Sequence, residues 1–168
     1  PDETADSNFT RTCTGQKMSE RFYLWTAEPD IYDNTKDIGL VLYRNLQLTK
    51  TAADDSDAKI EGAEFTIYRV DEYDADGNPV NYVNNEVGTY TTDANGLATA
   101  ENLYWFKEYV IKETKAADGY DIQGAEAAGA NIESLGEGTW LLKVPDKTSM
   151  LVTDTMTVTN VRTVQAQI

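Results

Sequence analysis

The chain has 168 residues, a net charge of −15 and no histidine, and its length suffices for one ordinary domain with an extension or for two small ones. The strong negative charge argues against nucleic-acid binding, because an acidic surface repels phosphate backbones. The absence of histidine excludes a Ser-His-Asp or Cys-His hydrolase, and the absence of a long apolar run argues against membrane insertion of this part of the protein.

Residues 1–44 are mostly polar and turn-rich, and we interpret them as an N-terminal extension or as the end of a preceding domain. They contain two short strand-like runs, RFYLW at 21–25 and GLVLYR at 39–44, which are too short to enclose a core. The only cysteine, Cys13, has no disulfide partner in the chain, and its spacing to Gln16 is that of one type of internal thioester. A free thiol in a polar arm is the better interpretation, because no recognisable fold surrounds the segment.

Residues 45–163 have a regular pattern and are predicted to form one domain, followed by a C-terminal tail at 164–168. Short alternating runs between Gly, Asp and Asn turns predict the strands 45–51, 63–70, 87–92, 97–101, 107–114, 140–144 and 150–161. The charged stretch 54–61 is predicted to be a turn, and the Ala/Gly/Glu-rich segment 116–138 has room for a helical turn at 123–132. About seven short strands separated by turns are typical of an all-β Greek-key sandwich.

Three of the predicted strands carry a polar side chain on the face that is otherwise apolar and aromatic. These side chains are Lys50 in NLQLTK, Glu113 in YVIKET and Asn160 in TMTVTN. Each has an ordinary explanation when taken alone: a strand-end lysine that reaches water, a surface partner of Lys115, and a turn residue. Together, an amine, a carboxylate and a carboxamide at inward positions are the groups needed for a covalent bond between two side chains.

The motifs along the chain resemble the B-type repeat of the collagen adhesin and the matching SpaA-like domains of Gram-positive pilins. The matching segments are LTK ending at Lys50, GAEFTIY at 62–68, YTTDANG at 90–96, YVIKETKAADGY at 109–120 and VTN ending at Asn160. The resemblance covers about 45–163 and implies a transthyretin-like (prealbumin-like) β-sandwich. One departure is Ala117, where the family often has proline; it affects a loop and not the polar residues.

The resemblance implies that Lys50 and Asn160 join in an intramolecular isopeptide bond and that Glu113 is the catalytic residue. Burial lowers the pKa of a lysine and raises that of a glutamate, so that a neutral amine can attack the asparagine carbonyl. The neutral acid then polarises that carbonyl and moves protons so that ammonia leaves. This reaction occurs once per molecule, needs no cofactor and no metal, and does not make the protein a turnover enzyme.

The resemblance also implies a cellular role as a structural stalk or pilin-type module of an extracellular, cell-wall-anchored surface protein. The expected partners are neighbouring domains of the same surface protein or pilus. The alternative is an adhesin module that binds a host extracellular-matrix protein or a glycan through residues 116–138 or through the N-terminal arm.

Two further motifs have less specific interpretations. The sequence DADGN at 74–78 resembles the start of a calcium loop, but Pro79 stands where such a loop needs glycine, and a hairpin is the better interpretation. The aromatic pair Trp105–Phe106 is predicted to lie in the core or to cover the Lys50–Asn160 site, rather than to form a sugar platform.

Overall fold

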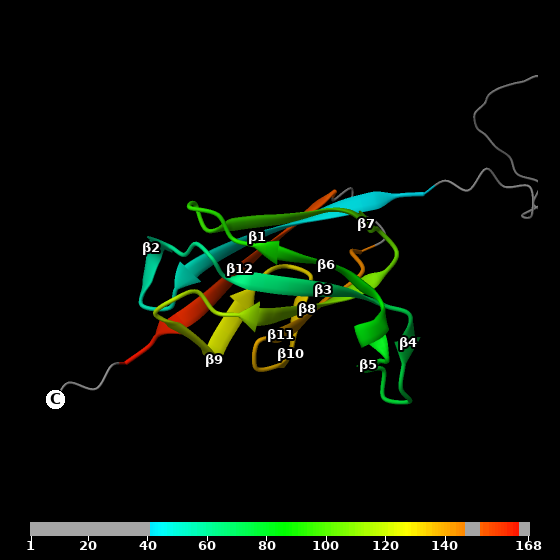
Figure 1. The fold of residues 1–168 in the computed structure, drawn as a ribbon. Coiled ribbons are helices and arrows are strands. Elements are labelled where there is room, and N and C mark those ends of the chain that lie inside the picture. The colour runs from blue at the N-terminus through cyan, green and yellow to red at the C-terminus, as the bar shows by residue number, and fades with distance from the viewer. Residues whose placement is uncertain (1–40, 147–151, 165–168) are drawn as a thin grey trace, which may run out of the picture. The chain divides into compact units, whose positions relative to one another are not determined.

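The computed structural model describes residues 41–146 and 152–164, and almost all of its regular structure is β-strand (Figure 1). The strands form two five-stranded sheets and one two-stranded hairpin. This confirms the predicted all-β fold. The Cys13–Gln16 segment, the run at 21–25 and most of the C-terminal tail lie outside the described residues, and the predicted division into an extension, a domain and a tail stays a prediction.

The first sheet has the order β2-β1-β12-β9, and β7 pairs with the edge of β1 that faces away from β12. Its strands are β1 (Tyr43–Ala52), β2 (Asp55–Lys59), β7 (Leu97–Tyr104), β9 (Tyr120–Ala128) and β12 (Thr153–Arg162). β1 and β12 are parallel, whereas the other pairs in this sheet are antiparallel. The first and the last strand of the described domain therefore lie side by side.

The second sheet has the order β10-β11-β8-β3-β6 and is antiparallel throughout. Its strands are β3 (Glu64–Val70), β6 (Glu86–Thr91), β8 (Glu108–Lys115), β10 (Ile132–Gly136) and β11 (Thr139–Leu142). A hairpin of β4 (Glu72–Tyr73) and β5 (Pro79–Val80) precedes the short 3-10 turn η4 (Tyr82–Asn84). This hairpin contains the DADGN motif, as predicted.

The main core lies between the two sheets and is built by the alternating residues of their inner faces. On β1 and β12 every second side chain is buried, which is the alternation that the sequence predicted. The largest buried apolar side chains of this core are Leu46, Phe65, Ile67, Leu103, Tyr109, Ile111, Trp140, Leu142 and Met156. Such a two-layer core holds the inward side chains of the facing sheets close together.

Two of the local predictions were wrong. No helical turn forms at 123–132, because this segment contributes the end of β9 and the start of β10, paired with β12 and β11. The charged stretch 54–61 contains β2 instead of only a turn. In both segments the local composition favours helix or turn, but pairing with an open sheet edge decides the structure.

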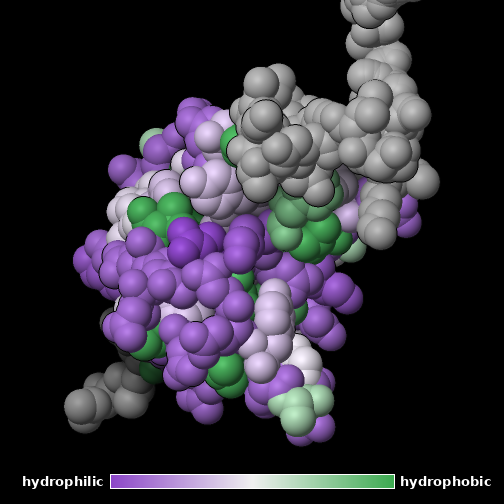
Figure 2. Space-filling model, turned by 90° about the vertical axis from the view of Figure 1, so that its right-hand side faces the viewer, coloured by the Kyte–Doolittle hydropathy of each residue, from purple (hydrophilic) through white to green (hydrophobic). Residues whose placement is uncertain are grey.

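The face of the molecule drawn in Figure 2 is mainly hydrophilic where it is not covered by grey atoms, with small separate hydrophobic areas. Within the described residues, the structure contains no helix long and apolar enough to cross a membrane.

Candidate functional site

Two neighbouring strands of the first sheet and one strand of the second bring a lysine, an asparagine and a glutamate together. Lys50 on β1 pairs with Val158 on β12, two residues before Asn160 on the same inner face. Glu113 lies on β8 in the facing sheet, where it pairs with Phe65. The three side chains predicted from the sequence are therefore neighbours in the core, although they come from distant parts of the chain.

One carboxylate oxygen of Glu113 contacts both nitrogen-bearing side chains. Lys50 Nζ donates a hydrogen bond to Glu113 Oε2 at 3.3 Å, and Asn160 Nδ2 donates to the same oxygen at 3.2 Å. Lys50 Nζ also lies 5.7 Å from the centre of the Phe65 ring, within the range of a cation–π contact. The Oε2 atom is thus shared by the amine of one strand and the amide of its neighbour.

The site is closed to solvent, and its burial shifts both titrating groups toward their neutral forms. The relative exposure is 0% for Lys50, 3% for Glu113 and 0% for Asn160. Burial lowers the pKa of Lys50 from 10.5 to about 8, although Glu113 opposes the shift. Burial also raises the pKa of Glu113 above its ordinary value of 4.5, against the opposing effects of Lys50 and Asn160. A neutral amine beside a neutral acid is therefore accessible near neutral pH.

Two buried acceptor atoms of the site, Glu113 Oε1 and Asn160 Oδ1, have no hydrogen-bond partner among the described residues. A buried polar atom left without a partner costs about 1–3 kcal/mol. A proton on the Glu113 carboxyl group would supply a donor next to these acceptors. The arrangement of polar atoms thus favours the neutral acid, in the same direction as burial does.

The turn between β6 and β7 holds the backbone of Lys50. Lys50 N donates to Gly96 O in this turn at 2.7 Å, whereas Lys50 O accepts at 3.0 Å from Ile60 N, which directly follows β2. Asp93 shapes this turn, because its Oδ1 accepts hydrogen bonds from the backbone of Asn95 and Leu97. The sequence indicated this turn, but its contact with Lys50 depends on how β1 and β7 pair and was not predicted.

Replacing Gly96 with alanine is expected to destabilise the domain by more than the about 1–3 kcal/mol that a strained backbone position usually costs, because the added Cβ would also clash with the backbone oxygen of Lys50. Gly96 has a φ of +73°, and an added Cβ would lie 2.6 Å from Lys50 O. Gly77→Ala is the matched control, because Gly77 has a φ of +87° with nothing within 4 Å of the added Cβ. Thermal unfolding of both variants tests whether the contact with Lys50 O adds to the cost of the substitution. Equal losses in Tm would show that this contact does not matter.

The aromatic pair Trp105–Phe106 does not cover the site. Trp105 is buried, as the predicted position in the core required, while Phe106 is 64% exposed. Trp105 N donates to Leu42 O beside the first residues of β1, whereas Lys50 lies near the end of that strand. The prediction of an aromatic lid over Lys50 was therefore wrong, because the pair lies at the other end of β1.

The oxygens of Asp74 in the DADGN loop are used to build the hairpin. Asp74 Oδ1 accepts from the backbone of Asp76 and Asn78, and Oδ2 accepts from Asn78 Nδ2. Across residues 41–146 and 152–164, acidic side chains nowhere gather in threes at positions that could hold a metal ion.

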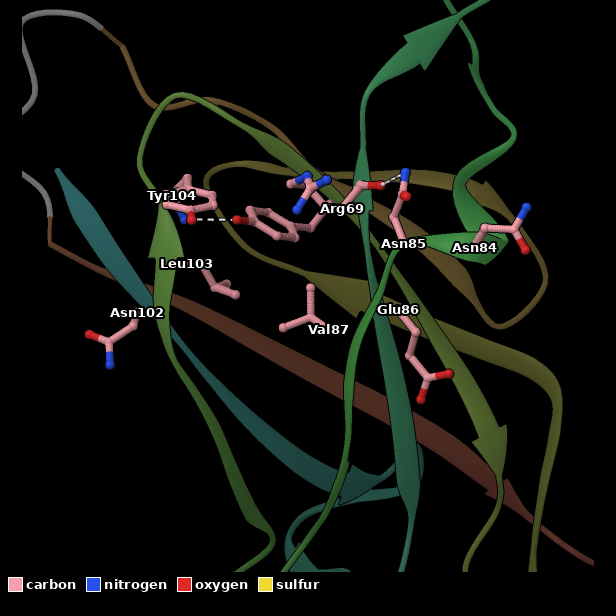
Figure 3. A pocket seen from close by; sticks show the side chains of 9 residues that line it. Arg69, Asn84, Asn85, Glu86, Val87, Asn102, Leu103 and Tyr104 are labelled. Atoms are coloured by element: carbon pink, nitrogen blue, oxygen red, sulfur yellow. Dashed lines mark hydrogen bonds between the residues drawn. The ribbon is translucent and has the colours of Figure 1, made fainter. Parts of the chain in front are cut away.

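A separate hollow of about 420 Å³ lies beside β6, β7 and η4 (Figure 3). Some of its polar groups are already paired: Tyr109 Oη accepts from Tyr104 N at 2.7 Å, and Asn85 Nδ2 donates to Arg69 O at 3.3 Å. The side chains of Asn84 and Asn102 point away from the hollow in Figure 3. Its polar groups do not converge on one point, so it is a weaker candidate site than the buried lysine.

Comparison with protein families and solved structures identifies the fold. The family described as "SpaA: Prealbumin-like fold domain" matches residues 44–143. The chain is similar to the full-length major pilin SpaD of Corynebacterium diphtheriae, with a TM-score of 0.50 and 20% identity over 74% of this chain and 32% of that one. No curated protein matches the chain significantly.

Two other solved structures align with lower structural scores. The TIE protein of Bacillus anthracis matches with a TM-score of 0.45 and 24% identity, over 72% of this chain and 17% of that one. The minor pilin GBS52 of Streptococcus agalactiae matches with a TM-score of 0.46 and 18% identity, over 77% of this chain and 49% of that one. The chain thus spans less than half of the length of each of these three proteins.

Proposed function

We propose, since the chain belongs to the SpaA family of prealbumin-like domains, that it is a pilin-type structural module stabilised by an isopeptide bond between Lys50 and Asn160. Glu113 is the catalytic residue in this proposal. The observation that carries it is the position of Glu113 Oε2, within hydrogen-bond distance of both the Lys50 amine and the Asn160 amide nitrogen. A base that touches both the attacking and the leaving nitrogen can carry a proton from one to the other.

The reaction starts when a proton moves from Lys50 Nζ to Glu113, which leaves a neutral amine and a neutral acid. The lone pair of Nζ attacks Asn160 Cγ and forms the new C–N bond, and the carbonyl electrons move onto Oδ1. Glu113 gives its proton to Nδ2 and accepts one from Nζ as the bond from Cγ to Nδ2 breaks. The products are a Lys50–Asn160 amide, one ammonia and a Glu113 carboxyl group that again carries its proton.

The amide of Asn160 can present either end to Glu113. In the ion-paired state Nδ2 faces Oε2, as a donor must face a carboxylate. After the proton transfer, a half-turn of the amide brings Oδ1 to the acid, which then donates to the carbonyl oxygen. Once Nζ has attacked, the reverse turn returns Nδ2 to Glu113, so that the leaving nitrogen can take the proton. This contact would satisfy Oδ1, which has no partner in the described structure, and would polarise the carbonyl for attack.

Folding replaces an external enzyme in this scheme. Groups that are held in a reactive geometry reach effective concentrations of about 10⁵ M or more, and the rigid pairing of β1 with β12 holds Lys50 and Asn160 side by side. The reaction occurs once in each molecule, so the domain is not a turnover enzyme. The bond would join the first and last strands of the domain and, unlike a disulfide, would resist reduction.

This architecture suits an extracellular module that bears tension. A force that enters along β1 and leaves along β12 would cross the domain through the new bond instead of through the core. The similar protein from Corynebacterium diphtheriae is named as a major pilin, which supports a pilin-type role. The proposal further places the chain in a cell-wall-anchored surface protein of a Gram-positive bacterium, with neighbouring domains of the same protein or pilus as partners.

The mass of the intact folded chain tests the proposal. The wild-type chain is expected to be lighter than its sequence by the mass of one ammonia, because Nδ2 leaves when the bond forms. Asn160→Leu keeps the Lys50–Glu113 pair but removes the leaving nitrogen, so this variant is expected at its sequence mass. A folded wild-type chain at the full sequence mass would rule out the bond.

Ligand binding through residues 116–138 stays a prediction. This segment is largely built into the sandwich, since β9 pairs with β12 and β10 pairs with β11. A loop that serves as a binding surface would be freer of such pairing, so we favour the structural role.

A further inference from the structure

The two ends of the β1–β12 pair are closed in different ways. Where the strands start, Arg44 Nη1 donates to Asp154 Oδ2 at 3.2 Å, and this ion pair is buried. Where they end, Lys50 and Asn160 are fully buried, although each lies only two residues before the last residue of its strand. The residues just beyond the site therefore determine whether water reaches it.

Three side chains from three segments meet directly beyond Asn160. Arg162 Nε donates to both carboxylate oxygens of Asp54 at 3.1 Å, and Arg162 Nη1 donates to Tyr120 Oη at 3.1 Å. The Arg162 guanidinium also lies 5.6 Å from the centre of the Tyr120 ring. We call Asp54, Tyr120 and Arg162 the end clasp. It joins the segment after β1 to the start of β9 and to the end of β12.

The register of β12 places the end clasp next to the site. Arg162 lies two residues after Asn160, and therefore on the same side of the sheet, and it pairs with Tyr120 on β9. The backbone makes the same connection, because Ala53 N, next to Asp54, donates to Asn160 O at 2.8 Å. The end clasp is thus the next layer from the reacting side chains toward solvent.

Tyr120 supplies the apolar part of the end clasp. Its ring packs against the main core, while its hydroxyl group accepts from the half-exposed Arg162. The turn from Ala117 O to Tyr120 N, at 3.1 Å, fixes where the ring enters the core. The other buried apolar residues at this end are one isoleucine and three alanines: Ile60, Ala52, Ala63 and Ala117. A tyrosine, with an apolar ring and a polar tip, suits the boundary between a dry site and water.

We propose that Tyr120 is a positioning residue for the Lys50–Asn160 reaction, which it serves by keeping water away from the Lys50 amine. Asp54 and Arg162 hold its ring in place. The residue acts through the dryness of the site and not as an acid or a base. Its value for the cross-link rests on the proposed isopeptide function, whereas the exclusion of water from Lys50 does not.

Among the described residues, Glu113 is the titrating group that contacts Lys50 directly. It approaches from β8 at 3.3 Å, while β12 and β3 present the uncharged side chains of Asn160 and Phe65. The charged residues on β2, on the turn before β7 and in the end clasp are exposed: Asp54, Asp55, Asp57, Lys59, Asp93 and Arg162. Solvent screens such charges. Loss of the Tyr120 ring therefore acts on Lys50 by admitting water, which favours the charged amine.

The effect on Lys50 is measured in chains that carry Glu113→Gln. Glutamine carries no proton between the reacting groups, so the slow residual loss of ammonia needs only the neutral amine, and the midpoint of its rate against pH reports the pKa of Lys50. Adding Tyr120→Ser is expected to move this midpoint toward 10.5, the ordinary value of a lysine. Below both midpoints the reaction should slow about tenfold for each pH unit of that rise. Tyr120→Phe, which keeps the ring, is expected to leave the midpoint in place.

Tyr82→Ser is the matched control for a general loss of stability, because Tyr82 is a partly buried tyrosine that packs against the smaller core cluster of Val70, Val110 and Leu141. It should leave the midpoint unchanged. An unchanged midpoint in Tyr120→Ser, or an equal rise in Tyr82→Ser, would overturn the role of Tyr120. If Tyr120→Ser does not fold, Tyr120→Val, which suits a strand but is too short to cover the site, is judged by the same midpoint.

A second measurement does not depend on the bond. In Asn160→Leu chains Lys50 keeps its free amine, and a short pulse of acetic anhydride shows whether a reagent dissolved in water reaches it. Peptide masses are expected to show Lys50 unmodified in the parent chain and after Tyr82→Ser, but acetylated after Tyr120→Ser.

The two measurements separate the two proposals. A wild-type chain that loses no ammonia, together with acetylation of Lys50 only after Tyr120→Ser, supports the cover and overturns the isopeptide bond. A wild-type chain that loses ammonia, with the same midpoint and the same protection of Lys50 after Tyr120→Ser, does the reverse.

Discussion

Replacing Glu113 with glutamine is expected to slow formation of the proposed Lys50–Asn160 bond by about 10²–10⁴-fold, the usual contribution of a general acid–base residue. Glutamine has nearly the same shape and fills the same space in the core, but it cannot carry a proton from Lys50 Nζ to Asn160 Nδ2. The rate is measured by refolding chains recovered unfolded from inclusion bodies and by sampling the loss of ammonia over time.

The pH dependence of this rate identifies the role of Glu113. The reactive pair holds one proton, shared by an acid whose pKa is raised by burial and an amine whose pKa is lowered to about 8. As pH falls through the Glu113 pKa, a second proton binds, the amine stays charged, and the rate falls. As pH rises above about 8 the pair loses its last proton, no acid remains, and the rate falls again.

The Glu113→Gln variant supplies the control for this profile. Its residual reaction needs only a neutral amine, so its rate is expected to rise with pH through the Lys50 pKa and then to level off. The two chains should therefore have opposite slopes on the alkaline side. A wild-type rate that keeps rising above pH 8 would show that Glu113 does not act as an acid.

The sequence predicted that the three polar side chains of the candidate site turn inward, because alternation along a strand is a reliable guide to which face a side chain takes. Lys50, Glu113 and Asn160 share the parity of apolar neighbours, and all three are buried. The same signal was available for Arg44 and Asp154, which share the inner face of Leu46 and Met156. Arg44 was not recognised as an inward polar residue, because the sequence analysis assigned it to the N-terminal extension. In the structure, β1 already begins at Tyr43.

Other features could not be predicted because they depend on contacts between distant segments. The Ala/Gly-rich residues of β9 have low intrinsic strand propensity, and they form a strand because the edge of β12 is open to them. The contact of Gly96 with Lys50 requires β7 to pair with β1, although the turn that contains Gly96 was evident from its sequence. Local patterns thus indicated which residues turn inward and where the chain turns, while sheet order decided their partners.

The proposed cross-link is expected to contribute about 5 kcal/mol to the free energy of unfolding, by analogy with a disulfide that closes a loop of about 110 residues. For a domain of this size that corresponds to about 15–25 °C in Tm. Asn160→Leu should therefore unfold at a much lower temperature than the wild type, although its Lys50–Glu113 ion pair and its core volume are kept. Reducing agents should have no effect on either chain.

A double-mutant cycle separates the bond from the side chains that make it. Asn160→Leu and Lys50→Met each abolish the same bond, but they disturb different local contacts, because Lys50 lies against Phe65 and Asn160 lies beside Thr159 O. If the bond dominates, Lys50→Met/Asn160→Leu should be no less stable than either single variant, and the coupling energy should approach the full value of the bond. Additive losses of about 1–2 kcal/mol each are what two ordinary buried polar groups would give. Such additivity would mean that no covalent bond joins β1 to β12. The two strands would then be held together only by their backbone hydrogen bonds and by packing in the core.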